Sequence, residues 1–127
     1  MTKKKPVVLS DLQLDVMRVL WRQGEVATPE VAAALAEARG LAHTTVATLL
    51  SRLEKRGVVA ARRDGRQLFY TAKVSEDQVR RSMVGELVAS LFGGDSRALL
   101  AHLVREDDVE PADLDAMRRL LKQGERP

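Results

Sequence analysis

The sequence predicts a mainly α-helical protein that carries one small β-hairpin. Apolar residues recur at helical spacing in three segments before residue 57, and again in most of the chain after residue 75. Between these two parts, an Asp-Gly pair separates two runs of β-compatible residues. The length of 127 residues suits one domain, or one small domain with an appendage.

The first helix is expected to begin after Ser10. Ser10 and Gln13 form the S-x-x-Q pattern of a capping box, in which each side chain accepts a hydrogen bond from the other residue's backbone. Gly24 follows the last apolar residue of this segment and is expected to end the helix. We interpret Trp21, the only tryptophan, as an anchor in the core.

Two further helices are predicted before the hairpin. Thr28 and Pro29 mark the start of the second helix, with the threonine as its cap, and this helix ends before Gly40. The third helix spans residues 43–56, and Gly57 follows it in the left-handed conformation. One face of the third helix is apolar, and the opposite face carries small polar and basic residues.

The hairpin is predicted from Asp64-Gly65, because a type I′ turn needs two central residues that tolerate positive φ. After the hairpin, Ser75 and Gln78 form a second capping box, Gly93-Gly94 ends that helix, and Pro111 starts the last one.

The charge is distributed unevenly along the chain. The net charge is +3, but residues 1–71 carry +5 and residues 72–127 carry −2. A basic segment at residues 2–6 belongs to the positive part. The N-terminal part is therefore the one suited to bind a polyanion.

The composition also excludes several classes of protein. The absence of cysteine excludes disulfides, cysteine metal sites and thiol catalysis. No uncharged apolar run approaches the ~18 residues of a membrane span, and the N-terminus has no signal-peptide pattern. We therefore expect a soluble, cytoplasmic protein that does not insert into a membrane.

Three helices followed by a hairpin, within about the first 72 residues, are the element order of a winged helix-turn-helix. Short hydroxyl side chains and a forked arginine on the third helix suit the major groove, and arginines at the hairpin tip suit the DNA backbone. Taken singly, these residues also fit a helix cap, a solvated face or a soluble strand edge. The candidate DNA-binding residues are Thr44, Thr45, Thr48, Arg52, Lys55, Arg62, Arg63 and Arg66.

Enzyme chemistry has little support in this sequence. The two histidines, His43 and His102, lie in different halves, and no metalloprotease, nucleophile-elbow or phosphate-loop motif occurs. The acidic residues between 106 and 110 lack the spacing of a calcium loop and are interpreted as a solvated turn. We expect no enzyme activity, no metal and no cofactor.

Residues 73–127 are predicted to form a helical dimerisation region, because their apolar residues are too many for three short helices to bury alone. The alternative is that these helices fold back on the chain's own N-terminal domain. The candidate dimerisation residues are Met83, Leu87, Leu91, Leu99, Leu100, Leu103, Leu114, Met117, Leu120 and Leu121.

Nearly the whole chain resembles a known family, the penicillinase-repressor type of bacterial transcription factor, also called the BlaI/MecI/CopY family. The resemblance is carried by LSDLQLDVMRVLW at 9–21, TPEVAAAL at 28–35, HTTVATLLSRLEKRGVV at 43–59, DGRQLFYTA at 64–72 and LLAHLVREDDVEPADLDAMRRLL at 99–121.

The resemblance implies a homodimer that binds palindromic operator DNA and represses β-lactamase-type or other stress-response genes. It also implies DNA contacts at Thr44, Thr45, Thr48 and Arg52. In the antibiotic-responsive members, a membrane sensor-protease triggers cleavage of the repressor, which makes such a protease a candidate partner.

Three features depart from the family pattern. The cleaved bond of the well-known members follows an Asn, and the candidate cleavage region here is His102-Leu103. The family's Ser-Pro opening of the recognition helix is Ala42-His43. The lack of cysteine excludes the copper-sensing mechanism of one branch. Two other functions stay open: a ligand-sensing winged-helix regulator, and a protein-interaction module that does not bind DNA.

Overall fold

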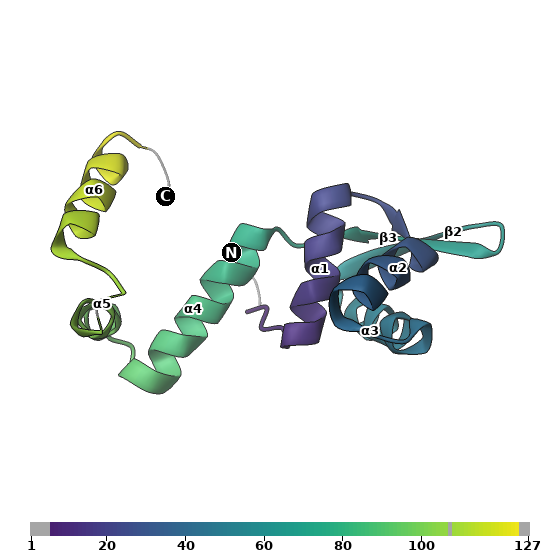
Figure 1. Ribbon diagram of the computed structural model, residues 1–127, viewed down its shortest axis with the longest axis horizontal. Helices are drawn as coiled ribbons and strands as arrows, with labels where there is room; N and C mark the ends of the chain where they lie inside the picture. The colour runs from purple at the N-terminus through teal and green to yellow at the C-terminus, as the bar shows by residue number, and fades with distance from the viewer. Residues whose placement is uncertain (1–5, 107, 125–127) are drawn as a thin grey trace, which may run out of the picture. The chain divides into compact units, whose positions relative to one another are not determined.

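The structure is a computed structural model that describes residues 6–106 and 108–124. The predicted basic segment up to residue 5 and Asp107 of the acidic turn lie outside the described residues. The helices and strands, labelled in Figure 1, are α1 (Asp11–Gln23), β1 (Val26–Ala27), α2 (Thr28–Arg39), α3 (His43–Lys55), β2 (Val59–Asp64), β3 (Gln67–Ala72), α4 (Glu76–Phe92), α5 (Ser96–Arg105) and α6 (Pro111–Lys122). The chain forms two compact units, one through Val84 and one from Gly85 onwards.

The start of α1 confirms the predicted capping box. The hydroxyl of Ser10 accepts a hydrogen bond from the Gln13 N–H at 3.2 Å, and the Gln13 side chain accepts one from the Ser10 N–H at 3.0 Å. These two bonds satisfy donors that a helix start otherwise leaves without a partner. The helix ends at Gly24, whose φ is 80°.

The predicted cap of α2 is wrong. Thr28 is the first residue of the helix, the N-cap position belongs to Ala27, and no side chain caps this end. The hydroxyl of Thr28 instead donates to the carbonyl of Leu68 at 3.3 Å, because β1 brings it beside β3. The end of the helix is as predicted, at Gly40 with a φ of 66°.

The sheet has three strands rather than the two of the predicted hairpin. Its order is β1-β3-β2, and both pairings are antiparallel. The two-residue strand β1 was not predicted, because two residues are too few to show the alternation of a strand. It places Val26 opposite Tyr70, so the segment between α1 and α2 is tied to the hairpin.

The hairpin turn lies one residue later than predicted. Asp64 pairs with Gln67 as the last residues of the two strands, so the central residues of the turn are Gly65 and Arg66. Gly65 has a φ of 62°. A glycine at the first central position supplies the positive φ that a tight hairpin needs, which explains the shift.

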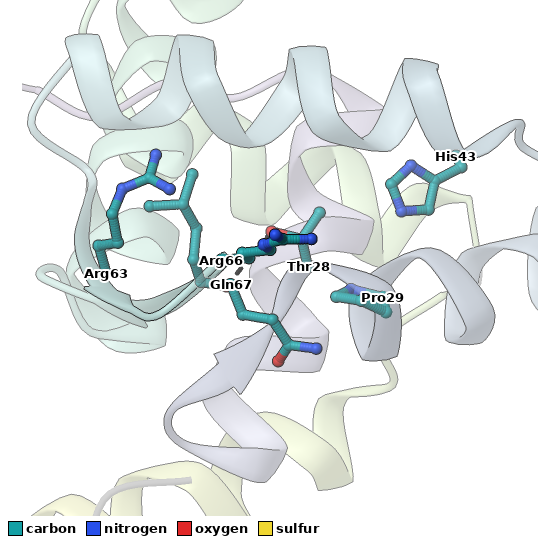
Figure 2. Close-up of a pocket in the computed structure, with 7 residues that line it drawn as sticks. Thr28, Pro29, His43, Arg63, Arg66 and Gln67 are labelled. Carbon is teal, nitrogen blue, oxygen red and sulfur yellow. Dashed lines mark hydrogen bonds between the residues drawn. The ribbon is translucent and has the colours of Figure 1, made fainter.

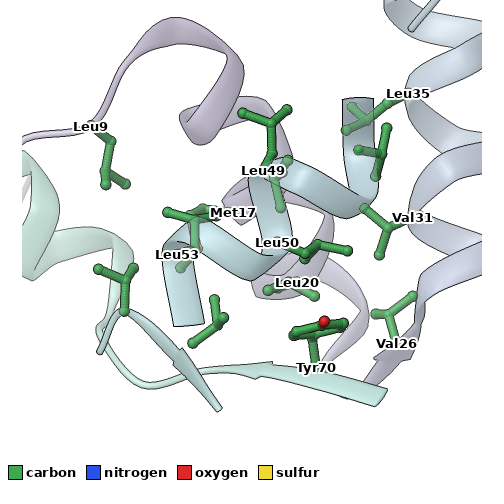
Figure 3. Close-up of a cluster of buried hydrophobic side chains, with 14 of the residues drawn as sticks. Leu9, Met17, Leu20, Val26, Val31, Leu35, Leu49, Leu50, Leu53 and Tyr70 are labelled. Carbon is green, nitrogen blue, oxygen red and sulfur yellow. The ribbon is translucent and has the colours of Figure 1, made fainter. Parts of the chain in front are cut away.

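The core of the first unit lies between the three helices and the inner face of the sheet (Figure 3). Leu50 and Leu53 of α3 are fully buried, and Tyr70 of β3 is 4% exposed. Trp21 is half-buried against this core, and its indole N–H donates to the carbonyl of Val74 at 2.9 Å. Val79 of α4 is 2% exposed within the same cluster, which explains why the first unit extends to Val84.

The helices of the second half start largely as the sequence predicts. The hydroxyl of Ser75 accepts from the Gln78 N–H at 3.0 Å at the start of α4, which is one half of the predicted box. The helix stops at Gly93-Gly94, both of which have positive φ. Pro111 opens α6, where the Glu110 N–H donates to the Asp113 side chain at 2.9 Å.

Candidate nucleic-acid interface

Helix α3 has one buried face and one exposed face. The buried side chains are Val46, Leu49, Leu50 and Leu53, none of them more than 8% exposed. The exposed polar and basic side chains are Thr44, Thr45, Thr48, Ser51, Arg52 and Lys55. At 3.6 residues per turn, Thr44, Thr48, Ser51 and Lys55 lie directly opposite the buried stripe, while Thr45 and Arg52 lie at its edge.

Ser51 is the residue that the sequence-based prediction missed on this face. It lies one turn beyond Thr48 and one turn before Lys55, and it is exposed. The same helical spacing that indicated its neighbours could have identified it. Its short hydroxyl side chain is of the same chemical type as the threonines.

Two details of α3 decide which groups are available to a ligand. The hydroxyl of Thr48 donates to the carbonyl of Thr44 at 2.9 Å, so its proton is engaged within the helix. Its methyl group and its oxygen lone pairs remain for contacts outside the helix. At the start of the helix, the N-cap residue Ala42 offers no side-chain acceptor. The first backbone N–H groups of α3 therefore lack a cap and are suited to an anion.

A pocket of about 220 Å³ lies where the starts of α2 and α3 meet the hairpin. Figure 2 shows Arg63 and His43 at opposite sides of this pocket, with Arg66 between them. The lining residues are Thr28, Pro29, His43, Arg63, Arg66, Gln67 and Leu68. The set contains two arginines and no carboxylate, so the pocket favours an anion.

The structure places Arg62 differently from its two neighbours in the predicted cluster. Side chains of successive strand residues point to opposite faces of a sheet, so Arg62 and Arg63 lie on different faces of β2. Arg62 pairs with Glu25, with an Nη2–Oε1 distance of 2.6 Å and an Nε–Oε2 distance of 3.1 Å. Its guanidinium also lies over the Phe69 ring, 4.8 Å from the centroid.

The Arg62–Glu25 pair is reflected in the pKa values of both groups. The hydrogen bond from Arg62 holds the pKa of Glu25 below its ordinary value, and the same bond raises the pKa of Arg62. Both side chains are about half exposed, at 52% and 40%. Arg62 is thus engaged within the protein, whereas Arg63 and Arg66 line the pocket.

The predicted dimerisation residues are mostly exposed or half-buried. Met83 belongs to the first unit and packs against its core. In the second unit Leu87, Leu91, Leu100, Met117 and Leu121 are between 40% and 69% exposed, and Leu99, Leu103, Leu114 and Leu120 are half-buried. Among the described residues of this unit only Val88, at 9% exposed, is buried.

The candidate cleavage region lies within α5. His102 is exposed, and its ring contacts that of Phe92 edge to face at a centroid distance of 6.0 Å. The carbonyl of His102 accepts from the Glu106 N–H at 3.1 Å, and that of Leu103 accepts from the Asp108 N–H at 3.0 Å. The peptide bond between them is therefore part of a hydrogen-bonded helix.

In residues 6–106 and 108–124, no group of three or more His, Asp or Glu side chains is placed to hold a metal ion. In the same residues, no single helix is long and apolar enough to cross a membrane. Helices α4 and α5, with an 84° bend between them, meet that criterion only as a pair, by length and composition.

Three helices, a three-stranded antiparallel sheet with a projecting hairpin, and an exposed polar and basic face on the third helix define a winged-helix domain of the DNA-binding class. Comparison with known proteins confirms this class. Residues 9–123 match the family described as penicillinase repressor. The chain belongs to this family, whose members are DNA-binding regulators and not enzymes.

Individual relatives agree with this assignment. The transcriptional regulator BlaI of Mycobacterium tuberculosis is 37% identical over 126 residues, covering 94% of this chain and 90% of the relative. The penicillinase repressor of Staphylococcus aureus is 22% identical over 117 residues, covering 92% and 93%. The resemblance stated from the sequence motifs is thus confirmed.

Solved structures show the same domain. The DNA-binding domain of the repressor BlaI is 34% identical with a TM-score of 0.53, covering 61% of this chain and 93% of that chain. The monomeric form of Bacillus licheniformis BlaI, solved in complex with the blaP half-operator, is 33% identical with a TM-score of 0.52, covering 60% and 93%. The predicted winged-helix fold is therefore confirmed.

Proposed function

We propose that this chain is a homodimeric repressor that binds a palindromic operator through α3 and the hairpin. The observation that carries the proposal is the pocket lined by Arg63, Arg66 and His43, which joins the hairpin to the start of the exposed face of α3. A structurally similar BlaI has been solved on a half-operator, which supports DNA as the ligand.

The residues of α3 have distinct expected roles. Thr44, Thr45 and Thr48 are small enough to let the helix approach the base edges, and their methyl groups suit the methyl of thymine. Arg52 can fork onto a guanine. Lys55 lies at the end of the exposed stripe and suits a phosphate.

The hairpin contributes affinity rather than sequence reading. Arg63 and Arg66 line a pocket of about 220 Å³, and the uncapped start of α3 opens beside it. A backbone phosphate bound there would be held by two guanidinium groups. Such contacts strengthen binding to every sequence and make it sensitive to salt.

The second unit supports self-association. Its described residues bury only Val88, while Leu91 is 69% and Leu121 is 64% exposed. Apolar side chains in such numbers are stabilised when a second copy covers them, and two-fold dimers are the commonest arrangement. Two heads on a two-fold axis would read half-sites about 34–36 Å apart.

Because the chain belongs to this family, we include in the proposal a sensor-protease as partner and β-lactamase-type genes as targets. The structure adds one condition on cleavage at His102-Leu103. Because the carbonyls of both residues accept backbone hydrogen bonds, α5 has to unwind locally before a protease can hold this bond in extended form.

The proposal is tested by fluorescence anisotropy of a labelled palindromic operator from a neighbouring promoter, titrated with the full chain at several salt concentrations. Tight binding that falls steeply with salt, and light scattering that gives the mass of a dimer, are the expected results. Absence of binding at low salt, together with an intact dimer, would instead identify a protein-interaction module.

A further inference from the structure

Arg62, Phe69 and Glu25 form a continuous line across the outer face of the sheet. Arg62 lies on β2, Phe69 faces it on the central strand β3, and Glu25 precedes β1 at the far edge. The side chain of Arg62 reaches over the Phe69 ring, at 4.8 Å from the centroid, and ends on both carboxylate oxygens of Glu25. We call these three residues the cross-sheet brace.

The brace lies on the face of the sheet opposite the pocket. Tyr70, next to Phe69 on β3, is buried in the core, so Phe69 points away from the helices. Arg63, next to Arg62 on β2, lines the pocket beside α3. Arg62 is therefore directed away from α3.

We propose that Glu25 and Arg62 are positioning residues that hold the hairpin at its angle to α3, and that Arg62 does not itself contact DNA. Within the sheet, β2 pairs only with β3, and β3 in turn pairs with the short strand β1. A two-point ion pair with a stacked ring fixes β2 to the segment that leads into α2. The ion pair forms before DNA binds, so Arg63 and Arg66 are already positioned when they meet the phosphate.

The geometry distinguishes this role from direct contact. Asp64 also lies 3.9 Å from the Arg62 guanidinium, so two carboxylates compete with any phosphate for it. The mutual effect on the pKa values of Glu25 and Arg62 agrees with a formed pair. The inference rests on the proposed DNA binding, and one of its two measurements is independent of DNA.

The test compares Glu25→Ala, Arg62→Ala and the double variant with Glu37→Ala. Glu37 is exposed on α2, and its removal changes the net charge by the same amount as removal of Glu25. The brace predicts that each single variant weakens operator binding by roughly two- to five-fold, beyond the change that the altered net charge alone produces. The double variant should be no worse than either single variant, because both remove one interaction.

The salt dependence separates positioning from contact. If Arg62 only positions the hairpin, the slope of log K against log salt stays the same in Arg62→Ala. If Arg62 binds a phosphate, the slope becomes shallower by about 0.9 per half-site. A shallower slope, or an affinity in Glu25→Ala that equals or exceeds that of Glu37→Ala, would overturn the proposal.

Amide hydrogen exchange of the free protein supplies the measurement that does not depend on DNA. The brace predicts faster exchange in β2 and β3 of Glu25→Ala and Arg62→Ala, and wild-type exchange in Glu37→Ala. Unchanged exchange in all variants would refute the brace. Failure of the wild-type chain to bind any duplex would refute the proposed function and leave the exchange result to decide on the brace.

Discussion

The salt dependence of DNA binding provides a direct test of the pocket between the hairpin and α3. Arg63 and Arg66 are the two cationic side chains that the hairpin contributes to its lining. Each phosphate contact contributes about 0.9 to the slope of log K against log salt. Because both arginines would hold the same phosphate, Arg63→Ala/Arg66→Ala should make the slope shallower by about 0.9 per half-site.

This change is large enough to measure. Between 50 and 200 mM salt, a slope difference of about 0.9 means that the advantage of the wild type over the variant shrinks by about 3.5-fold per half-site. If both heads of a dimer bind, the slope difference doubles. Fluorescence anisotropy of one labelled operator, with an unrelated duplex in parallel, gives both slopes. The loss should be similar on the two duplexes, because phosphates carry no sequence information.

The matched control is Arg22→Ala/Arg97→Ala, which removes the same two charges from exposed residues that do not line the pocket. Its slope should stay close to that of the wild type. If the control and the pocket variant change the slope equally, the effect is one of net charge and the assignment of the pocket fails. If the pocket variant keeps the wild-type slope, neither arginine contacts phosphate.

Three further predictions concern the first unit. Leu53→Ala, which empties a fully buried position of α3, should lower the free energy of unfolding, measured by urea denaturation, by about 2–5 kcal/mol. A comparable loss in the control Lys55→Ala, at an exposed position, would contradict this description of the core. Ala42→Ser adds the missing cap at an extended residue, with φ −70° and ψ 150°, and should stabilise the protein by about 1 kcal/mol; an unchanged melting temperature would contradict it. Burial raises the pKa of Tyr70, the only tyrosine, so absorbance should show it ionising at higher pH in the native than in the unfolded chain. Its contribution to stability is then complete below its unfolded pKa and is lost as the pH rises through its folded pKa; coincident titration curves would contradict this.

The start and end of most helices could be predicted from the sequence because the signals are local. Ser10 and Gln13 are three residues apart, and both bonds of the capping box run between these two residues, so the sequence pattern contains the whole box. Glycines at the helix ends act in the same way, through their own φ. The exposed face of α3 was equally readable, since one helical period decides it, although Ser51 was overlooked.

The errors arose where a local signal competed with a distant partner. Thr28 has the chemistry of a cap, but its hydroxyl donates to Leu68, which is 40 residues away. The strand β1 exists only because β3 offers it a partner. The turn residues shifted by one because strand pairing, and not the Asp-Gly pair alone, sets the register.

The sequence by itself determined the order of the helices and the hairpin, the two faces of α3 and the family of this protein, because those properties depend on neighbours along the chain. Only the tertiary structure decided how the three hairpin arginines divide their roles. Arg63 and Arg66 meet His43 in one pocket, while Arg62 crosses the sheet to Glu25, 37 residues away. The physical reason is that strand pairing and alternation place adjacent arginines on opposite faces, where each meets partners from different parts of the chain.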